Sequence, residues 1–253
     1  MICAPISPTC EGAAVAQTYV LITGAWHGGW AWRPVAERLR AQGHRVLTPT
    51  LPGLADGDDP TAHQLGDVVD FVVDVVESRD LRDVTLVGHS WGGYVITGAA
   101  PRLALRLGRL VYWSAFVPAA DRPLYEEIPP SYQELFGSLA AASGTNSIAL
   151  PFEVFAGAFM QDAPEPVQRT VHSLLVPHPF QYFTTPVAPV DPAALGVPTT
   201  YLVSVDDIAL PPGAFAWAPR FPERLGVAAV PIPGSHEALF TDPDSLATAL
   251  LQP

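Results

Sequence analysis

Residues 86–96, with the sequence LVGHSWGGYVI, constrain the fold of this chain more than any other stretch. The apolar run DVTLVG (residues 83–88) predicts a strand that leads into them, and the sequence from Tyr94 onward predicts a helix. Ser90 therefore stands between a strand and a helix in a G-x-S-x-G pattern, which in this setting is typical of a nucleophile on a strained turn. Glycine also suits a tight connection that has no chemistry, because bulkier side chains would collide there. The flanking strand and helix favour the nucleophile.

Strand-like and helix-like patterns alternate along most of the chain. This alternation predicts the α/β fold class, with a mostly parallel central sheet flanked by helices on both faces. We expect strands at residues 18–23, 44–50, 83–88, 109–115, 199–205 and 226–232. We expect helices at residues 32–43, 67–79, 94–107 and 242–251, the last of them capped by Asp242.

Residues 118–192 interrupt this alternation with many prolines and short apolar helical patches. Their Phe, Leu and Tyr content is too high for a linker that stays in water. We interpret them as a small, mainly helical cap inserted into one core domain, which residues 18–117 and 193–253 form. We expect residues 1–17 to be a flexible leader. The chain has 253 residues, 49% of them hydrophobic, which is enough for one large core.

Composition argues against several classes of partner. A formal charge of −12, with only 13 Lys and Arg residues, predicts no nucleic-acid partner because phosphate groups would be repelled. No apolar run reaches the roughly 20 residues of a membrane span, and the leader lacks the basic start and apolar middle of a secretory signal. We expect a soluble, cytoplasmic protein with no membrane partner. Cys3 and Cys10 lack Cys or His neighbours at metal-ligand spacing, so we expect reduced thiols and no metal site.

A serine hydroxyl is a weak nucleophile, so Ser90 needs a base, and the base needs an acid that orients it. His236 lies in a loop just after the last predicted strand, where an imidazole can reach back over the sheet. Asp206 and Asp207 follow the preceding strand, so serine, acid and histidine come in the order expected of this fold. Both aspartates are candidates for the acid, and the alternative is a pair of solvated turn residues.

The other histidines are better explained by hydrogen bonding or contact with solvent than by a role as the base. They lie at the variable position of the serine turn, near the first strand, at the start of the second strand, or in connections and the cap. These residues are His27, His44, His63, His89, His172 and His178.

Attack by a serine also needs two backbone N–H groups that bind the developing oxyanion. One is expected from the residue after the nucleophile, Trp91. The other is expected from the loop after the first strand, in LITGAWHGGWAW, where Gly24 and Ala25 follow the strand immediately. A glycine-rich turn with aromatic packing is the alternative, but the position of this loop before a helix favours an oxyanion site.

Several stretches of the chain together resemble one branch of the α/β-hydrolase superfamily. They are VLITGAWHGGWAW, TLPGL, VGHSWGGYVI, YWSAFVP, HPFQYFTTPV, SVDDIALPP and GSHEALF. The branch contains plant methyl esterases, hydroxynitrile lyases and their bacterial relatives, and the resemblance extends from about Thr18 to the C-terminus and includes the cap. It implies an eight-stranded, mostly parallel sheet, although the leader is short for all the early strands.

The resemblance also implies roles for individual residues. The oxyanion donors fall on Ala25 and Trp91. The acid falls on Asp207, because this residue stands four positions before Pro211 in the D-x-x-x-P pattern of the family. Asp206 remains an alternative.

Three positions depart from the branch. Relatives usually carry His where this chain has Thr23, which changes how the oxyanion loop is supported but leaves its backbone donors. Cyanohydrin-cleaving members carry Thr at the position of Gly24 and Lys at the position of Glu237, where a positive charge suits a cyanide leaving group. Glu237 either places a negative charge beside His236 or faces solvent. The missing lyase groups favour ester chemistry.

We therefore expect a serine hydrolase that cleaves a carboxylic ester, thioester or lactone of a small apolar or aromatic substrate through an acyl-enzyme. Ser90, His236 and Asp207 would form the triad, and no cofactor is required. One alternative is a non-hydrolytic enzyme of secondary metabolism, such as a cyclase, dehydratase or lyase. Another is a receptor-like member that only binds its ligand. The expected partner is a small-molecule substrate, and a homodimer is left open.

Overall fold

The structure, a computed structural model, describes residues 16–120 and 122–252. Most of the predicted flexible leader, with Cys3 and Cys10, lies outside the described residues. Its last residue, Gln17, donates its backbone N–H to Nδ1 of His44 at 3.1 Å. The chain enters the central sheet directly after this contact.

Six parallel strands form the central sheet, in the order β2-β1-β3-β4-β7-β8. They are β1 (Thr18–Ile22), β2 (Arg45–Leu47), β3 (Val84–His89), β4 (Leu107–Trp113), β7 (Thr199–Ser204) and β8 (Ala229–Ile232). The predicted α/β class and every predicted strand are confirmed, with β2 and β8 shorter than expected. The implied number of eight strands is wrong for the described residues, because the first strand there begins at Thr18 and already pairs on both edges.

Both faces of the sheet are buried, which is why its strands read as nearly continuous apolar runs. Side chains alternate between the two faces along a strand. In β1, Tyr19 and Leu21 therefore join one apolar core, while Val20 and Ile22 join the other. All six residues of β3, which leads to Ser90, are buried.

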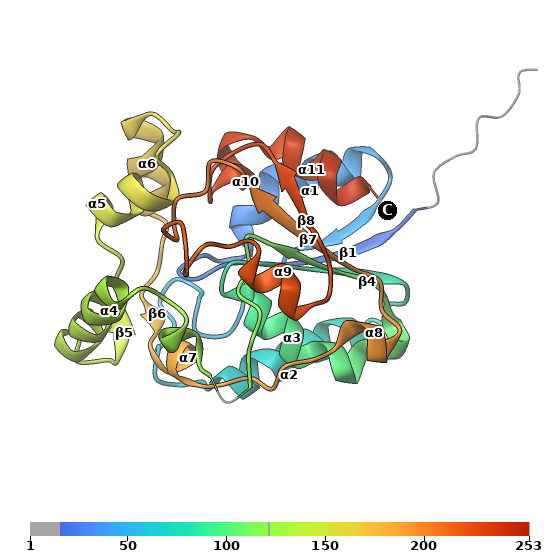
Figure 1. Cartoon of the computed structure of the whole chain (residues 1–253), viewed down its shortest axis with the longest axis horizontal. Coiled ribbons are helices and arrows are strands. Elements are labelled where there is room, and N and C mark those ends of the chain that lie inside the picture. The colour runs from blue at the N-terminus through green and yellow to red at the C-terminus, as the bar shows by residue number, and fades with distance from the viewer. Residues whose placement is uncertain (1–15, 121, 253) are drawn as a thin grey trace, which may run out of the picture.

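Helices cover each face, as Figure 1 shows. One face carries α1 (Arg33–Ala41), α10 (Ala238–Thr241) and α11 (Pro243–Leu251), and the other carries α2 (Leu65–Glu77) and α3 (Gly92–Leu103). The predicted cap of the last helix is confirmed, since the Asp242 carboxylate accepts a hydrogen bond from the Ser245 N–H at 3.1 Å. Shorter elements complete the core: η1 (Gly29–Trp32), η2 (Ala104–Arg106) and α9 (Arg220–Arg224).

Short helices fill most of the chain between β4 and β7. They are η3 (Leu124–Glu126), α4 (Pro130–Ala142), α5 (Phe152–Val154), the π-helical turn η4 (Phe155–Phe159), α6 (Glu165–His172), α7 (Gln181–Thr184) and α8 (Pro192–Leu195). A small antiparallel ladder joins β5 (Ser147–Ile148) to β6 (His178–Pro179). Figure 1 shows α4, α5 and α6 gathered at one end of the molecule. The interpretation of residues 118–192 as a separate cap stays a prediction.

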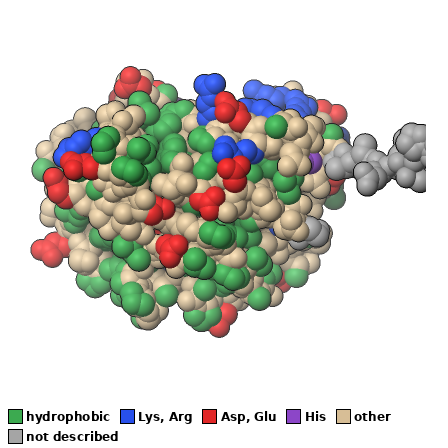
Figure 2. Space-filling model, turned by 90° about the horizontal axis from the view of Figure 1, so that it is seen from above, with side chains coloured by type: hydrophobic (Ala, Val, Ile, Leu, Met, Phe, Trp, Pro, Cys, Tyr) green, Lys and Arg blue, Asp and Glu red, His purple; other side chains and the backbone are tan. Residues whose placement is uncertain are grey.

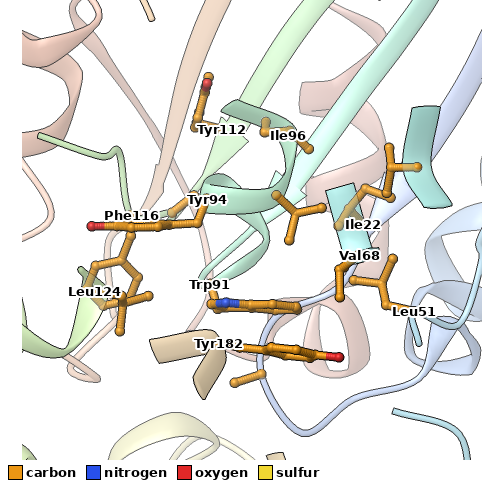
Figure 3. Close-up of a cluster of buried hydrophobic side chains, with 14 of the residues drawn as sticks. Ile22, Leu51, Val68, Trp91, Tyr94, Ile96, Tyr112, Phe116, Leu124 and Tyr182 are labelled. Atoms are coloured by element: carbon orange, nitrogen blue, oxygen red, sulfur yellow. The ribbon is translucent and has the colours of Figure 1, made fainter. Parts of the chain in front are cut away.

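The core on the α2 and α3 side continues into this segment without a break. In the cluster of Figure 3, the Trp91 ring stacks on Tyr182 of α7, with ring centroids 5.4 Å apart and planes 6° from parallel. Trp91 follows Ser90 directly, so the packing of the helical segment reaches the predicted nucleophile.

Charged side chains of both signs lie close together on the surface. On the face shown in Figure 2, Lys and Arg side chains lie beside Asp and Glu, with apolar side chains scattered between them. Within the described ranges, no helix combines the length and the apolar character that crossing a membrane requires.

Candidate active site

Ser90 occupies a strained turn at the carboxyl end of β3. Its φ angle is 52°, in the left-handed region that residues other than glycine rarely adopt. The backbone around it is fixed on both sides, because the Ser90 carbonyl accepts hydrogen bonds from the N–H groups of Gly93 and Phe116, each at 3.1 Å. The unfavourable conformation expected from the sequence is therefore present at the serine itself.

Glycine is required beside this turn for steric reasons. A Cβ atom at Gly92 would lie 2.6 Å from the carbonyl oxygen of Thr23, and one at Gly93 would lie 2.1 Å from that of Phe116. Neighbouring backbone segments therefore approach helix α3 at distances that only glycine permits. This approach brings the loop after β1 next to Ser90.

His236 and Asp207 meet at the carboxyl ends of β7 and β8. These strands are parallel neighbours, so the loops that follow them lie side by side. Oδ2 of Asp207 lies 2.7 Å from Nδ1 of His236, and both side chains are buried. The carboxylate accepts a hydrogen bond from the N–H at Nδ1, which leaves the Nε2 lone pair free to act as a base.

The two aspartates that the sequence left open differ in the structure. Asp207 bonds to His236, and its second oxygen accepts the Ala209 N–H at 2.9 Å. Asp206 is exposed, and its contact with the helical segment is through its carbonyl, which accepts a hydrogen bond from Gln161 Nε2 at 2.6 Å. Only Asp207 is therefore placed to orient the histidine.

Opposing effects set the pKa of His236. Burial favours the neutral imidazole and would lower the pKa, but the charge of Asp207 and its hydrogen bond stabilise the imidazolium. The carboxylate prevails, so the pKa of His236 is raised above its ordinary value. The imidazole also stacks on Trp217, with ring centroids 5.4 Å apart and planes 15° from parallel.

Ser90 and His236 line one cavity together with Ala25 and Trp91. Four of the five predicted site residues therefore meet there, and Asp207 lies behind the histidine. The rest of the lining is almost entirely apolar: Trp26, Phe116, Leu124, Ile128, Tyr132, Phe136, Phe159, Phe183, Ala209, Leu210 and Trp217. Sequence reasoning did not single out these wall residues, although the aromatic content of residues 118–192 indicated such a wall.

The N–H groups of Ala25 and Trp91 are both available to a ligand. Within residues 16–120 and 122–252, neither donates a hydrogen bond to another group. Both residues are buried and border the cavity next to Ser90. This is the arrangement expected of two oxyanion donors.

Polar contacts hold the loop that carries Ala25. The Thr23 hydroxyl donates to the His27 carbonyl at 3.1 Å, so the residue that replaces the family's usual histidine supports the loop in its own way. Trp26, at φ 66°, donates its N–H to Nδ1 of His178 at 3.3 Å. His178 belongs to β6, so residues 118–192 also anchor the loop that carries Ala25.

Two further buried histidines are confined to packing and hydrogen bonding, as the sequence predicts. Burial lowers the pKa of His178 to about 3, so its ring stays neutral at physiological pH. Burial likewise lowers the pKa of His89, whose ring stacks on Trp113 at 4.1 Å between centroids. Neither of these histidines lines the cavity.

Glu237 does not face solvent, so that alternative is wrong. Its side chain is 2% exposed, and Oε1 lies 3.6 Å from Nε2 of His27 in the oxyanion loop. Glu237 directly precedes α10, and its buried side chain faces the imidazole of His27, a residue far away in the sequence. In the described part of the chain, no group of three or more His, Cys, Asp or Glu side chains is arranged to hold a metal ion.

Comparison with known proteins agrees with this geometry. The model of the alpha/beta hydrolase family matches residues 19–249. The chain belongs to this family. An extracellular alpha/beta-hydrolase from a Paenibacillus species has a solved structure that superposes on this hydrolase with a TM-score of 0.88. It is 29% identical in sequence, and the match covers 93% of this chain and 98% of that one.

Several relatives of this chain are named as esterases. The carbendazim hydrolyzing esterase of Nocardioides sp. (strain SG-4G) is 46% identical over 117 residues, which cover 44% of this chain and 47% of that enzyme. The aligned stretch is thus about half the length of that relative. Methylesterase 1 of Arabidopsis thaliana is 26% identical over 93% of this chain and 95% of its own length. A pyrethroid hydrolase and an alpha-hydroxynitrile lyase are also among the relatives, which confirms the branch that the motifs resemble. The chain is thus an alpha/beta hydrolase whose relatives include several named esterases.

Proposed function

We propose that this chain hydrolyses a carboxylic ester, thioester or lactone of a small, neutral, aromatic or apolar substrate through an acyl-enzyme on Ser90. One observation carries the proposal. The strained serine and a histidine bonded to a buried aspartate border the same aromatic cavity as two backbone N–H groups that have no hydrogen-bond partner in the described part of the chain.

Each group has one task in the proposed reaction. Nε2 of His236 takes the proton of Ser90 as its oxygen attacks the substrate carbonyl, and Asp207 stabilises the imidazolium that forms. The N–H groups of Ala25 and Trp91 bind the oxyanion, each worth about 3 to 4 kcal/mol in comparable hydrolases. His236 then protonates the leaving alcohol and activates the water that releases the acid. No cofactor takes part.

The cavity wall supports the neutral, aromatic character of the substrate. Among its described lining residues there is no lysine or arginine that would pair with a carboxylate or phosphate on the substrate. Several of the lining rings pack against one another: Trp26 contacts Phe136 of α4 and Phe183 of α7, with ring centroids 5.7 and 6.0 Å apart. A cavity of this kind selects mainly by apolar area and shape. The esterase relatives support the reaction class.

Covalent labelling together with turnover tests the proposal. The protein is incubated with a serine-directed aryl phosphonate, the labelled peptide is identified by mass spectrometry, and hydrolysis of chromogenic aryl and alkyl esters is followed by absorbance. We expect one adduct on Ser90 and faster turnover of the aryl esters. Labelling without turnover would favour the cyclase, dehydratase or lyase alternative. Tight ligand binding without labelling or turnover would favour a receptor.

A cytoplasmic location and a homodimer stay predictions beside this proposal, as does the absence of nucleic-acid and membrane partners.

A further inference from the structure

A second buried pair of histidine and carboxylate lies next to the proposed triad. It consists of His27, in the loop after β1, and Glu237, which follows His236 directly. Their side chains are 4% and 2% exposed, and Nε2 of the histidine lies 3.6 Å from Oε1 of the carboxylate. The pair therefore joins the loop that carries the oxyanion donor to the loop that carries the base.

Hydrogen bonding fixes the tautomer of His27. Its Nδ1 lies 2.7 Å from the carbonyl oxygen of Ala25, and a carbonyl can only accept, so Nδ1 carries the proton. In the neutral ring Nε2 then presents a lone pair, and this lone pair faces an oxygen of the Glu237 carboxylate. Two electron-rich atoms at this separation repel each other unless a proton lies between them.

Burial makes that proton necessary. The Oε2 atom of Glu237 and the Nε2 atom of His27 have no hydrogen-bond partner among the described residues. A bare carboxylate in such surroundings would be strongly unfavourable, whereas a carboxylate paired with an imidazolium is compensated. As an ion pair, the two side chains together carry no net charge.

The ring of His27 also packs against two aromatic rings in tilted arrangements. Its centroid lies 5.8 Å from that of Trp30 and 6.2 Å from that of Phe240. The remaining freedom of the ring is rotation about its side-chain bonds, and the contact with Glu237 opposes this rotation. The position of the ring in turn determines where the carbonyl of Ala25 lies, and the N–H of the same residue is the proposed oxyanion donor.

We propose that His27 and Glu237 are positioning residues that form a buried ion pair and thereby hold Ala25 where its N–H meets the oxyanion. The inference rests on the proposed hydrolase function. Neither side chain touches the substrate, since neither lines the cavity. Their contribution is the orientation of Ala25 through the hydrogen bond from Nδ1 of His27.

Two substitutions of Glu237 separate this role from simple packing. Glu237→Gln keeps the shape and supplies an amide N–H for the Nε2 lone pair of neutral His27, so we expect kcat within about threefold of the unmodified protein. Glu237→Met keeps the volume but leaves Nε2 without a partner. Removal of one oxyanion donor lowers kcat by about 100- to 1,000-fold, so we expect a partial, roughly tenfold loss from a misplaced donor.

The readout is the parallel between the rate and the binding of a transition-state mimic. An aryl trifluoromethyl ketone adds to Ser90 and places an oxyanion against Ala25 and Trp91. In Glu237→Met its affinity should fall by the same factor as kcat, while KM stays within about twofold. Rescue of both quantities in Glu237→Gln would support positioning. A loss confined to KM, or equal losses in Glu237→Gln and Glu237→Met, would overturn it.

A double-mutant cycle tests the pairing itself. His27→Asn retains a side-chain N–H that can reach the Ala25 carbonyl but removes the partner of Glu237. If the two residues act together, the double variant H27N/E237M should be no slower than the slower single variant. Additive losses would contradict the pair. The exposed Glu37→Gln serves as the control for loss of a carboxylate, and its kcat should be unchanged.

Two measurements keep the outcomes distinct. Thermal unfolding of each variant shows whether it is folded. If Glu237→Met does not fold, Glu237→Gln is compared with His27→Asn instead, and the same outcomes in kcat, KM and affinity for the ketone support or overturn the positioning role. Ester turnover and the Ser90 adduct of the unmodified protein are measured first. Their absence would refute the proposed function, whereas normal turnover that is insensitive to Glu237 would refute only the positioning pair.

Discussion

The loops at the carboxyl ends of the sheet differ in character from residues 118–192, which cover them. In the loops, polar groups meet at hydrogen-bond distance and the backbone is strained, as at Ser90 with its φ of 52°. In the covering segment, the residues that reach the cavity are apolar or aromatic, such as Leu124, Phe136 and Phe183. Under the proposed function, the loops would perform the chemistry, and the covering segment would contribute to the selection of the substrate.

The covering segment is nevertheless attached to the core by polar contacts away from the cavity. The fully buried Glu127 accepts hydrogen bonds from Arg220 and Arg224 of α9. On the opposite side, the Tyr182 hydroxyl donates to the Pro52 carbonyl at 2.9 Å. These contacts hold the aromatic wall in place while leaving its inner surface apolar. Substitutions in the two regions should therefore differ in kind as well as in size.

The largest effect is expected from Ser90→Ala in the loop region. Without the nucleophile, ester turnover should fall by at least about 10⁴-fold, as in other hydrolases that lose this residue. The melting temperature should change little or rise, because alanine removes no buried hydrogen bond of the serine side chain, and binding of a product analogue should persist. Steady-state kinetics and calorimetry measure the two quantities. Activity at the unmodified rate would contradict the role of Ser90.

The second effect compares the adjacent aspartates. Asp207→Asn should lower kcat by about 10⁴-fold, the loss seen when a triad carboxylate becomes an amide. Asp206→Asn should stay within about threefold, because its side chain is exposed and makes no contact with His236. Both variants replace one carboxylate by an amide, and they do so at adjacent positions, so each controls for the other. A larger loss from Asp206→Asn would reverse the assignment.

A pH profile tests the same contact through the base. His236 must be neutral to accept a proton, and Asp207 raises its pKa against the opposing effect of burial. The acidic limb of kcat/KM should therefore lie above the ordinary histidine value, with activity falling tenfold per pH unit below it. In Asp207→Asn the charge and hydrogen bond of Asp207 are lost, which leaves burial opposed only by the charge of Glu237, so the limb of the residual activity should move to lower pH. A limb that does not move would show that another group titrates.

The loop region was largely predictable from the sequence because its geometry is set over short distances. The strand, turn and helix around Ser90 occupy consecutive residues, and parallel strands bring Asp207 and His236 to one edge. The choice of Asp207 over Asp206 needed the spacing to Pro211, since both follow the same strand. Thr23 was expected to change the support of the oxyanion loop, and the structure shows how its hydroxyl does so.

The covering segment and Glu237 were much less predictable. Whether Phe136 or Phe152 reaches the cavity depends on how short helices pack on the core, and both have the same local pattern. The direction of Glu237 depends on His27, more than 200 positions earlier in the chain. Contacts of this kind leave no periodicity that a single sequence reveals.

A smaller effect is expected in the covering segment. Phe136→Ala removes a ring of α4 that lines the cavity and contacts Trp26, with centroids 5.7 Å apart. KM for an aryl ester should rise about tenfold while kcat changes little, because lost apolar contact weakens ground state and transition state alike. The free energy of unfolding should be about 3 to 5 kcal/mol lower than that of the unmodified protein. Phe152→Ala is the control: its ring lies under Arg169 outside the cavity, so KM should not change. A fall in kcat without a rise in KM would contradict the assignment of substrate selection to residues 118–192.

The smallest effect is expected for cyanohydrins, which separate this chain from its lyase relatives. Cyanide leaves as an anion, and two unit charges about 4 Å apart interact by roughly 4 kcal/mol at an effective dielectric constant near 20, so a lysine in the site favours its release. Here Glu237 occupies that position and is paired with His27, and a side chain at Gly24 would place its Cβ 3.0 Å from that of Ser90. We expect no cyanide release above that of Ser90→Ala from aromatic or aliphatic cyanohydrins, alongside turnover of the matching esters. Glu237→Lys should lower the melting temperature without creating lyase activity, because a buried lysine would face His27. Cyanide release by the unmodified protein at a rate comparable to its best ester would assign the loop region to lyase chemistry instead.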